Sequence, residues 1–93
     1  MNDIVVETVP RLAPGCRLGS AGSQQDMLLV PEGALKMKGP ARVILELCDG
    51  QRTVGTIVDE LSRLFPSENA ARIESDVIGI LTRLRDRGVV EGA

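Results

Sequence analysis

The apolar residues of this chain follow two different periods. After residue 40 they recur at spacings of three and four residues, which is typical of helices with one buried face. Before residue 40 they occur in short runs separated by glycine, proline and serine, which is typical of strands and turns. We therefore predict a small antiparallel sheet followed by three helices.

Three short strands are predicted, at residues 16–18, 27–30 and 34–38. The second is a run of four apolar residues, so we expect burial on both of its faces. Residues 19–26 have the composition of a loop, and residues 31–33 that of a tight turn. Because side chains alternate along a strand, the third strand should direct Leu35 and Met37 to one face and Ala34, Lys36 and Lys38 to the other.

The first nine residues are expected to form an N-terminal arm on a single domain that spans residues 10–93. An apolar run at residues 4–6 is compatible with a strand or with an ordered arm. Pro10 and Pro14 follow, and we expect them to interrupt regular strand pairing, because proline has no N–H to donate.

The first two of the three predicted helices are expected to form a helix-turn-helix. Gly39 and Pro40 suit a helix start, since a proline in the first turn loses no helical hydrogen bond. Asp49-Gly50 should end the first helix, Thr53 should cap the second, and Pro66 should end it. The two apolar stripes comprise Ala41, Ile44, Leu45 and Cys48, and then Val54, Ile57, Val58, Leu61, Leu64 and Phe65.

The last helix carries the strongest amphipathic pattern in the chain. Ser67 or Asn69 can cap its start, and Gly88 should close its end. Gly79 lies inside it, where glycine costs about 1 kcal/mol relative to alanine but lets another backbone come close. The apolar stripe consists of Ala70, Ile73, Val77, Ile80, Leu81 and Leu84.

Composition limits the possible functions. The 93 residues fit one domain, and 11 basic against 13 acidic side chains give a net charge of −2. With one aromatic residue and no basic half, the chain lacks the usual features of a nucleic-acid-binding protein. No apolar stretch approaches the ~20 residues of a membrane span, and the start lacks the basic region of a signal peptide, so we expect a cytoplasmic protein.

The sequence contains no evident catalytic or metal-binding set. There are no histidines and only two isolated cysteines, so neither a metal site nor a nucleophile with its base is predicted, and we expect no enzyme activity and no cofactor. We interpret Cys48 as a small buried hydrophobic residue and Cys16 as part of a strand. Asp49-Gly50 and Glu32 are interpreted as turn residues.

A three-stranded sheet followed by three helices, with a helix-turn-helix between the first two, describes a winged helix-turn-helix-like α+β fold. Two functions are compatible with it. A peptide-binding module would accept an extended peptide at the exposed edge of the third strand. A DNA-binding transcriptional regulator would use the helix-turn-helix, but the last helix region, residues 68–87, balances four arginines with four acidic residues.

The chain also resembles a known family. The residues that carry the resemblance are Pro31-Glu32, then Leu47-Cys48-Asp49-Gly50 with Thr53-Val54 and Ile57-Val58, and finally Asp76-Val77 with Leu81 and Leu84. In these positions it closely resembles the pyrroloquinoline quinone (PQQ) biosynthesis protein D family, over residues 10–90. It departs from many relatives at Lys38-Gly39-Pro40, near the start of the first helix.

The resemblance implies a function and a binding site. Members of that family are peptide-recognition domains that bind the ribosomally made precursor peptide, PqqA, and present it to the radical S-adenosylmethionine enzyme, PqqE, which joins a glutamate and a tyrosine of the peptide. In relatives the peptide lies along the third strand, against the third helix. The matching residues here are Leu35, Lys36, Met37 and Lys38 on the strand and Asp76, Val77, Ile80, Leu81 and Leu84 on the helix. The same stripe must also seal the helical bundle, so a place mainly in the core is a strong alternative for each of the four apolar helix residues. The chain is expected to be a monomer, or a homodimer formed by strand exchange about a hinge at Gly39-Pro40.

Overall fold

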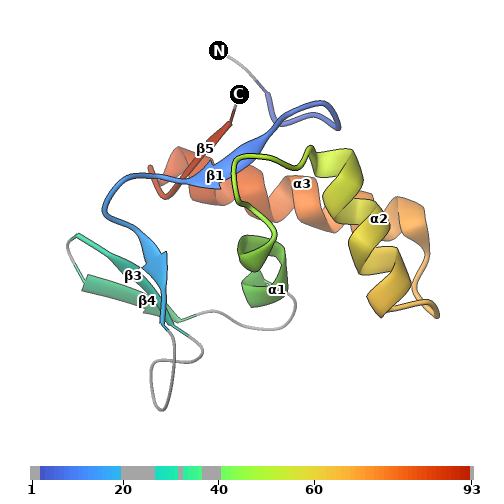
Figure 1. Cartoon of the computed structure of the whole chain (residues 1–93), viewed down its shortest axis with the longest axis horizontal. Helices are drawn as coiled ribbons and strands as arrows, with labels where there is room; N and C mark the ends of the chain where they lie inside the picture. The colour runs from blue at the N-terminus through green and yellow to red at the C-terminus, as the bar shows by residue number, and fades with distance from the viewer. Residues whose placement is uncertain (1–2, 20–26, 32, 37–40, 93) are drawn as a thin grey trace.

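The protein is a small mixed α+β domain (Figure 1). The computed structural model describes residues 3–19, 27–31, 33–36 and 41–92. The helices are α1 (Ala41–Glu46), α2 (Val54–Leu64) and α3 (Ala70–Asp86). The strands are β1 (Pro10–Leu12), β2 (Arg17–Leu18), β3 (Met27–Val30), β4 (Gly33–Lys36) and β5 (Val90–Gly92).

The predicted three-stranded antiparallel sheet is present, in the order β2-β3-β4. Its central strand, β3, has the predicted bounds, while β2 is one residue shorter than expected. The expectation that β3 is buried on both faces was wrong, because only Leu28 is buried and its neighbours are partly exposed. Leu28 is the residue that faces the helices, so the apolar run reflects one buried face and one half-covered face.

A second sheet, formed by β1 and β5, was not predicted. It joins the two ends of the chain, with Pro10 opposite Gly92 and Leu12 opposite Val90 (Figure 1). The expectation that Pro10 would interrupt pairing was wrong for a geometric reason. The carbonyl oxygen of Pro10 accepts a hydrogen bond from the N–H of Gly50, so its backbone polar side faces away from β5. The N–H that proline lacks would therefore not have joined the ladder.

The segment before β1 packs against the helices without forming a strand. Ile4 is 5% exposed and belongs to the hydrophobic core. The carbonyl oxygens of Thr8 and Val6 accept hydrogen bonds from the N–H groups of Val54 and Gly55, at 2.8 and 2.9 Å. These are N–H groups of the first turn of α2, which have no partner inside the helix. The segment therefore completes the start of α2.

The junction between α1 and α2 follows the predicted signals. Helix α1 ends earlier than expected, at Glu46, because the N–H groups of Leu47 and Cys48 bond to carbonyls three residues back and tighten the chain into a turn. Gly50 has a φ of +77°, the left-handed conformation that glycine adopts most easily. The hydroxyl of Thr53 accepts from the N–H of Thr56 at 3.1 Å and caps α2.

Helix α3 is capped at both ends. The side-chain oxygen of Asn69, rather than Ser67, accepts from the N–H groups of Ala71 and Arg72. At the other end the N–H of Gly88 bonds to the carbonyl of Arg85 and that of Val89 to the carbonyl of Leu84, both at 2.9 Å. This pair of bonds is a Schellman motif, with Gly88 in the left-handed conformation at φ +77°. It turns the chain directly into β5.

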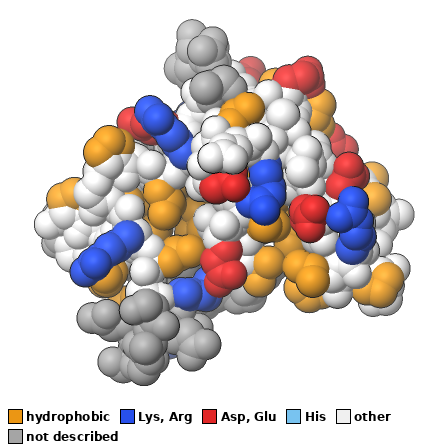
Figure 2. Space-filling view, viewed as in Figure 1, with side chains coloured by type: hydrophobic (Ala, Val, Ile, Leu, Met, Phe, Trp, Pro, Cys, Tyr) orange, Lys and Arg blue, Asp and Glu red, His pale blue; other side chains and the backbone are white. Residues whose placement is uncertain are grey.

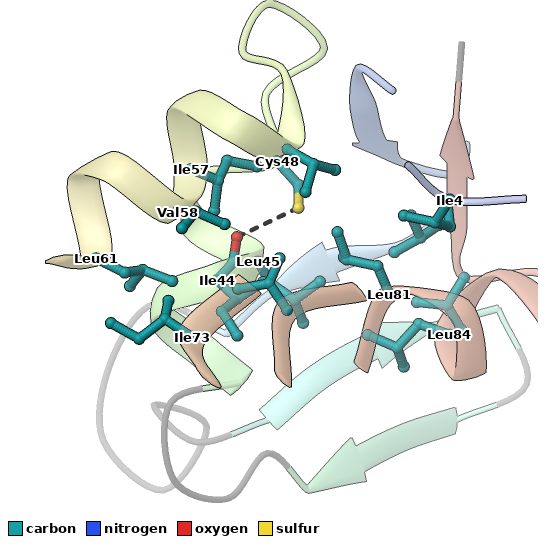
Figure 3. Packing of buried hydrophobic residues seen from close by; sticks show 14 of the residues in the cluster. Ile4, Ile44, Leu45, Cys48, Ile57, Val58, Leu61, Ile73, Leu81 and Leu84 are labelled. Carbon is teal, nitrogen blue, oxygen red and sulfur yellow. Dashed lines mark hydrogen bonds between the residues drawn. The ribbon is translucent and has the colours of Figure 1, made fainter. Parts of the chain in front are cut away.

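The core lies where the three helices, β3 and the N-terminal segment meet (Figure 3). Most predicted stripe positions are buried there, among them Ile44, Leu45, Val54, Ile57, Leu61, Ile73, Val77, Leu81 and Leu84. Two stripe positions at the end of α2 are not: Leu64 is 59% exposed and Phe65 is 41% exposed. Helix α2 ends at Leu64 with Phe65 as its C-cap, before the chain turns into α3, so these two side chains extend past the packed interface.

The burial of α3 leads to a first prediction. Leu81 is fully buried, so replacing it with alanine leaves a cavity, and we expect Leu81→Ala to lower the free energy of unfolding by about 2 to 5 kcal/mol. Leu64→Ala is the matched control, since an exposed leucine should change stability by less than about 0.5 kcal/mol. Both values come from urea denaturation followed by circular dichroism. A loss below about 1 kcal/mol for Leu81→Ala would contradict its place in the core.

Gly79 inside α3 and Gly88 just after its C-cap provide a second prediction, in which the two substitutions have opposite effects on stability. A Cβ added at Gly79 meets no atom within 4 Å, so Gly79→Ala should stabilise the protein by about 0.5 to 1 kcal/mol through helix propensity. Gly88 also has open space around it, but its positive φ strains any other residue, so Gly88→Ala should destabilise the protein. Thermal melts of the two variants measure both effects, and stabilisation by Gly88→Ala would argue against the Schellman cap.

A third prediction concerns the two thiols. Burial, helped by the charge of Asp49, raises the pKa of Cys48 to about 12, and its thiol donates to the carbonyl of Ile44 at 3.2 Å. The thiolate that reacts with disulfide reagents is therefore not populated at Cys48 near neutral pH. In the native protein at about pH 8 we expect reagent to label the partly exposed Cys16 and to spare Cys48 until denaturant is added. Labelling of native Cys16→Ser at the rate of the denatured protein would disprove the burial of Cys48.

Candidate functional site

Strand β4 is an edge strand, and its outer side pairs with no described residue. Lys36 stands opposite Met27 of the central strand. The carbonyl oxygen of Met27 accepts a hydrogen bond from the N–H of Gly19 at 2.9 Å, so it points toward β2 and away from β4. Since the N–H and C=O of one residue point to the same side of an antiparallel strand, Met27 and Lys36 form a non-hydrogen-bonded pair. The N–H and C=O of Lys36 consequently point outward, and by the same alternation those of Ala34 do too.

The side chains of β4 alternate as predicted. Leu35 is partly buried and packs against the hydrophobic core, whereas Ala34 and Lys36 are exposed. The strand therefore presents at its edge a row of peptide groups that have no partner among the described residues, while Leu35 fixes the strand to the core. The predicted continuation of this surface, Met37 and Lys38, lies outside the described residues, as does Glu32.

The five residues predicted on α3 fall into two groups. Val77, Leu81 and Leu84 are buried in the core, with exposed fractions of 0%, 0% and 7%. Asp76 is exposed and Ile80 is partly exposed. The structure thus brings Leu35, Val77, Leu81 and Leu84 together as parts of one core, and leaves Asp76 and Ile80 as the predicted helix residues that a ligand can reach.

The accessible part of α3 forms a shallow groove of about 580 Å³. Its lining residues are Ser75, Asp76, Gly79, Ile80 and Arg83. Asp76 and Arg83 are two helical turns apart, about 10 Å, and give its ends opposite charges. Three of these lining residues, Ser75, Gly79 and Arg83, were not predicted from the sequence as part of a candidate site. The unexplained cost of a glycine inside a helix was the signal that pointed to this face.

A deeper apolar cleft of about 470 Å³ lies where the three helices meet. Its walls are Val43 and Ile44 of α1, Leu61 and Phe65 at the end of α2, and Ile73 and Val77 of α3, and its mouth carries Glu68, Arg72 and Asp76. Hydrophobic side chains are visible on this side of the molecule, around α1 and the lower end of α2 (Figure 2). Five of these wall residues lie on the predicted helical stripes, and Val77 was also a predicted peptide-binding residue, but no cleft was predicted here.

The titratable groups at the helix-turn-helix junction serve the fold. The carboxylate of Asp49 accepts from the N–H groups of Gln51 and Arg52 at 2.9 and 3.1 Å and pairs with the Arg52 guanidinium at 2.7 Å. The backbone N–H of Gln51, with further help from Arg52, lowers the pKa of this carboxyl group. Asp49 is therefore an ionised turn residue, as predicted, and its hydrogen-bonding capacity is used within the turn.

Neither a metal-binding cluster nor a membrane-spanning helix is found in the described part of the chain. No group of three or more cysteine, aspartate or glutamate side chains there is arranged to hold a metal ion. None of the helices in the same residues is long and apolar enough to cross a membrane. The arrangement that remains is a free strand edge, a helix groove with charged ends and an apolar cleft, which together are suited to binding an extended chain.

Comparisons with known proteins identify the family. The family model described as coenzyme PQQ synthesis protein D (PqqD) matches residues 27–90. A PqqA binding protein of Methylococcus capsulatus is 37% identical over 83 residues, which cover 88% of this chain and 86% of that protein. A PqqA binding protein of Azotobacter vinelandii is 34% identical over 92 residues, covering 98% of each chain.

A solved structure agrees with this result. The solution NMR structure of the PqqD truncation of Methylobacterium extorquens PqqCD is similar to this chain with a TM-score of 0.75 and 33% identity. The match covers 89% of this chain and 88% of that one, and the relative is described as a stand-alone recognition element for ribosomally synthesised, post-translationally modified peptides. On the family match, the identity and the shared fold, this chain belongs to the PqqD family of coenzyme PQQ synthesis proteins.

Proposed function

We propose that this protein is a peptide chaperone of PQQ biosynthesis that binds the precursor peptide PqqA as an added strand on β4. The observation that carries the proposal is the outward direction of the N–H and C=O groups of Ala34 and Lys36. Two such residues, spaced by two along a strand, are what an incoming extended chain needs to continue the ladder. The names of the relatives, PqqA binding proteins, supply the identity of the peptide.

The proposal assigns the recognition surface to the edge of β4 and the exposed face of α3. Of the residues expected from the family resemblance, Leu35, Lys36, Met37, Lys38, Asp76 and Ile80 are assigned to the peptide surface. Val77, Leu81 and Leu84 are assigned to the packing that holds α3 in place beneath that surface. Their burial supports this division, because side chains that are at most 7% exposed offer little surface to a ligand on the outward face of α3.

In this proposal residues 10–93 act as one winged helix-turn-helix-like domain with residues 1–9 as its arm, and the hairpin of β3 and β4 corresponds to the wing. The protein catalyses no step itself and presents the bound peptide to the radical enzyme PqqE in the cytoplasm, where the ribosome makes the precursor. The balance of basic and acidic side chains gives no comparable support for DNA binding.

The test removes one outward N–H without touching the sheet. Lys36→Pro deletes the N–H that points to the open edge, and the β conformation before it, at Leu35, suits a proline. We expect Lys36→Pro to weaken binding of the precursor peptide at least about tenfold, because a hydrogen bond is lost and the ring obstructs the edge. Lys36→Ala should weaken it by no more than about threefold, since main-chain bonds carry the interaction. Isothermal titration calorimetry measures both.

Leu35→Pro is the control for damage to the sheet. The N–H of Leu35 points toward β3, so its loss should disrupt the β3–β4 hairpin and lower the melting temperature, whereas Lys36→Pro should melt close to the parent protein. A folded Lys36→Pro protein that binds the peptide as tightly as the parent would show that the peptide does not add to β4.

A further inference from the structure

The apolar cleft between the three helices has an aromatic side chain at its mouth. Phe65 is the single aromatic residue of the chain, and it is 41% exposed although a concave apolar surface lies beside it. An exposed apolar residue is unremarkable alone, but an exposed aromatic next to an apolar concavity is typical of a binding site. Neither the free edge of β4 nor the groove of α3 accounts for it.

The position of Phe65 is fixed by its backbone. Its N–H bonds to the carbonyl of Leu61 at 2.8 Å, and its own carbonyl accepts from the N–H of Glu68 at 3.0 Å. Phe65 is thus held on both sides, as the C-cap of α2 and as the start of the turn that leads to α3. The main chain that carries Phe65 is therefore already held in place, and a ligand that enters the cleft does not have to order this segment first.

The cleft is continuous with the groove on α3. Asp76 lines both of them, with Gly79 and Ile80 one turn further along the groove and Ile73 and Val77 inside the cleft. Gly79 presents no side chain, and no internal contact requires a glycine there, so the groove is low at the point where a bound chain would cross it. A peptide that follows the exposed face of α3 toward its N-terminal end therefore reaches the cleft without leaving the protein surface.

The mouth of the cleft carries a net negative charge, which disfavours the binding of an acidic segment. Two of its three charged side chains, Glu68 and Asp76, are negative, and Arg72 lies between them on the helix surface. The walls offer no charge to a group that enters, because they are formed by aliphatic side chains and Phe65. The chemistry that fits is an apolar side chain carried by a chain that is not strongly acidic at that point.

We propose that this cleft is a second contact site for the same precursor peptide, in which Phe65 covers an apolar side chain of the segment that continues beyond the α3 groove. The proposal rests on the peptide-binding function proposed above and adds a specificity-determining residue outside β4. It makes recognition two-part: main-chain bonds at β4 hold any extended chain, and the cleft selects the chain that places an apolar residue at the correct distance from the bound strand.

The test compares two neighbouring exposed residues. Phe65→Ala removes a wall of the cleft, whereas Leu64→Ala removes a more exposed side chain that does not line it. We expect Phe65→Ala to weaken binding of the synthetic precursor peptide about tenfold in calorimetric titration, and Leu64→Ala to change it by less than about twofold, with both variants retaining the melting temperature of the parent within a few degrees. Equal affinities for Phe65→Ala and the parent would overturn the proposal.

A spectroscopic measurement makes the outcome independent of the variants. Because the protein has one phenylalanine and no tyrosine or tryptophan, ¹³C labelling of phenylalanine gives the signals of the Phe65 ring alone. These signals should shift as peptide is added and saturate together with the calorimetric binding curve. Ring signals that stay unchanged at saturation, or that shift with protein concentration in the absence of peptide as a second copy enters the cleft, would each overturn the proposal.

These outcomes are separate from those of the proposed function. If the parent protein fails to bind the precursor peptide, the proposed function itself is wrong. If the parent binds, Lys36→Pro does not, and Phe65→Ala binds like the parent, then addition to β4 stands and the second contact site is refuted.

Discussion

The rest of the structure depends on the burial of one face of α3. Ile73, Val77, Leu81 and Leu84 lie along that face and contact a core to which α1, α2, β3 and the N-terminal segment all contribute. A domain of this size has few other sources of stability, since it contains one aromatic residue and both of its cysteines are free. The same constraint separates the two faces of the helix: the inward face is used in packing, and the outward face with Asp76, Gly79 and Ile80 is the part that a ligand can reach.

A second set of contacts ties the ends of the chain to the helix-turn-helix. Strand β1 pairs with β5 on one side. On its other side the carbonyl of Pro10 accepts a hydrogen bond from the N–H of Gly50, and the backbones of Arg11 and Asp49 form an isolated antiparallel β-bridge. The segment before it supplies acceptors to the first turn of α2. The backbone polar groups at the α1–α2 turn are satisfied in this way by residues some 40 positions earlier in the sequence, which fixes the angle between the helices from outside the helical bundle.

These contacts do not extend to the outer edge of β4. The hairpin of β3 and β4 is anchored through Leu28 and Leu35, but the outer peptide groups of β4 have no described partner. An unsatisfied strand edge invites pairing with another chain, and proteins usually cover or charge such an edge. Here the edge carries Lys36, and the helices of the same domain expose a groove and an apolar cleft. This arrangement is expected if the chain that pairs with the edge is a specific peptide.

The sequence by itself determined the elements that local chemistry controls. The caps at Thr53, Asn69 and Gly88, the left-handed turn at Gly50 and the central strand at residues 27–30 follow from capping groups and apolar spacing within a few residues, and they were predicted correctly. The same is true of four buried positions of the α3 stripe, Ile73, Val77, Leu81 and Leu84, whereas the stripe position Ala70 is exposed. The family resemblance suggested two candidate surfaces, β4 and α3, but it did not separate the buried residues of α3 from the accessible ones.

Only the tertiary structure decided the features that need residues far apart in the chain. The pairing of Pro10 with Gly92 joins residues whose local patterns gave no sign of each other, and a proline there is acceptable because its polar side faces Gly50. The exposure of Phe65, the apolar cleft beside it and the outward direction of the Lys36 N–H depend equally on which elements come together. A periodic pattern states which side of an element is apolar, but the extent to which that side is covered is set by the lengths and angles of its neighbours, and these are properties of the packed domain.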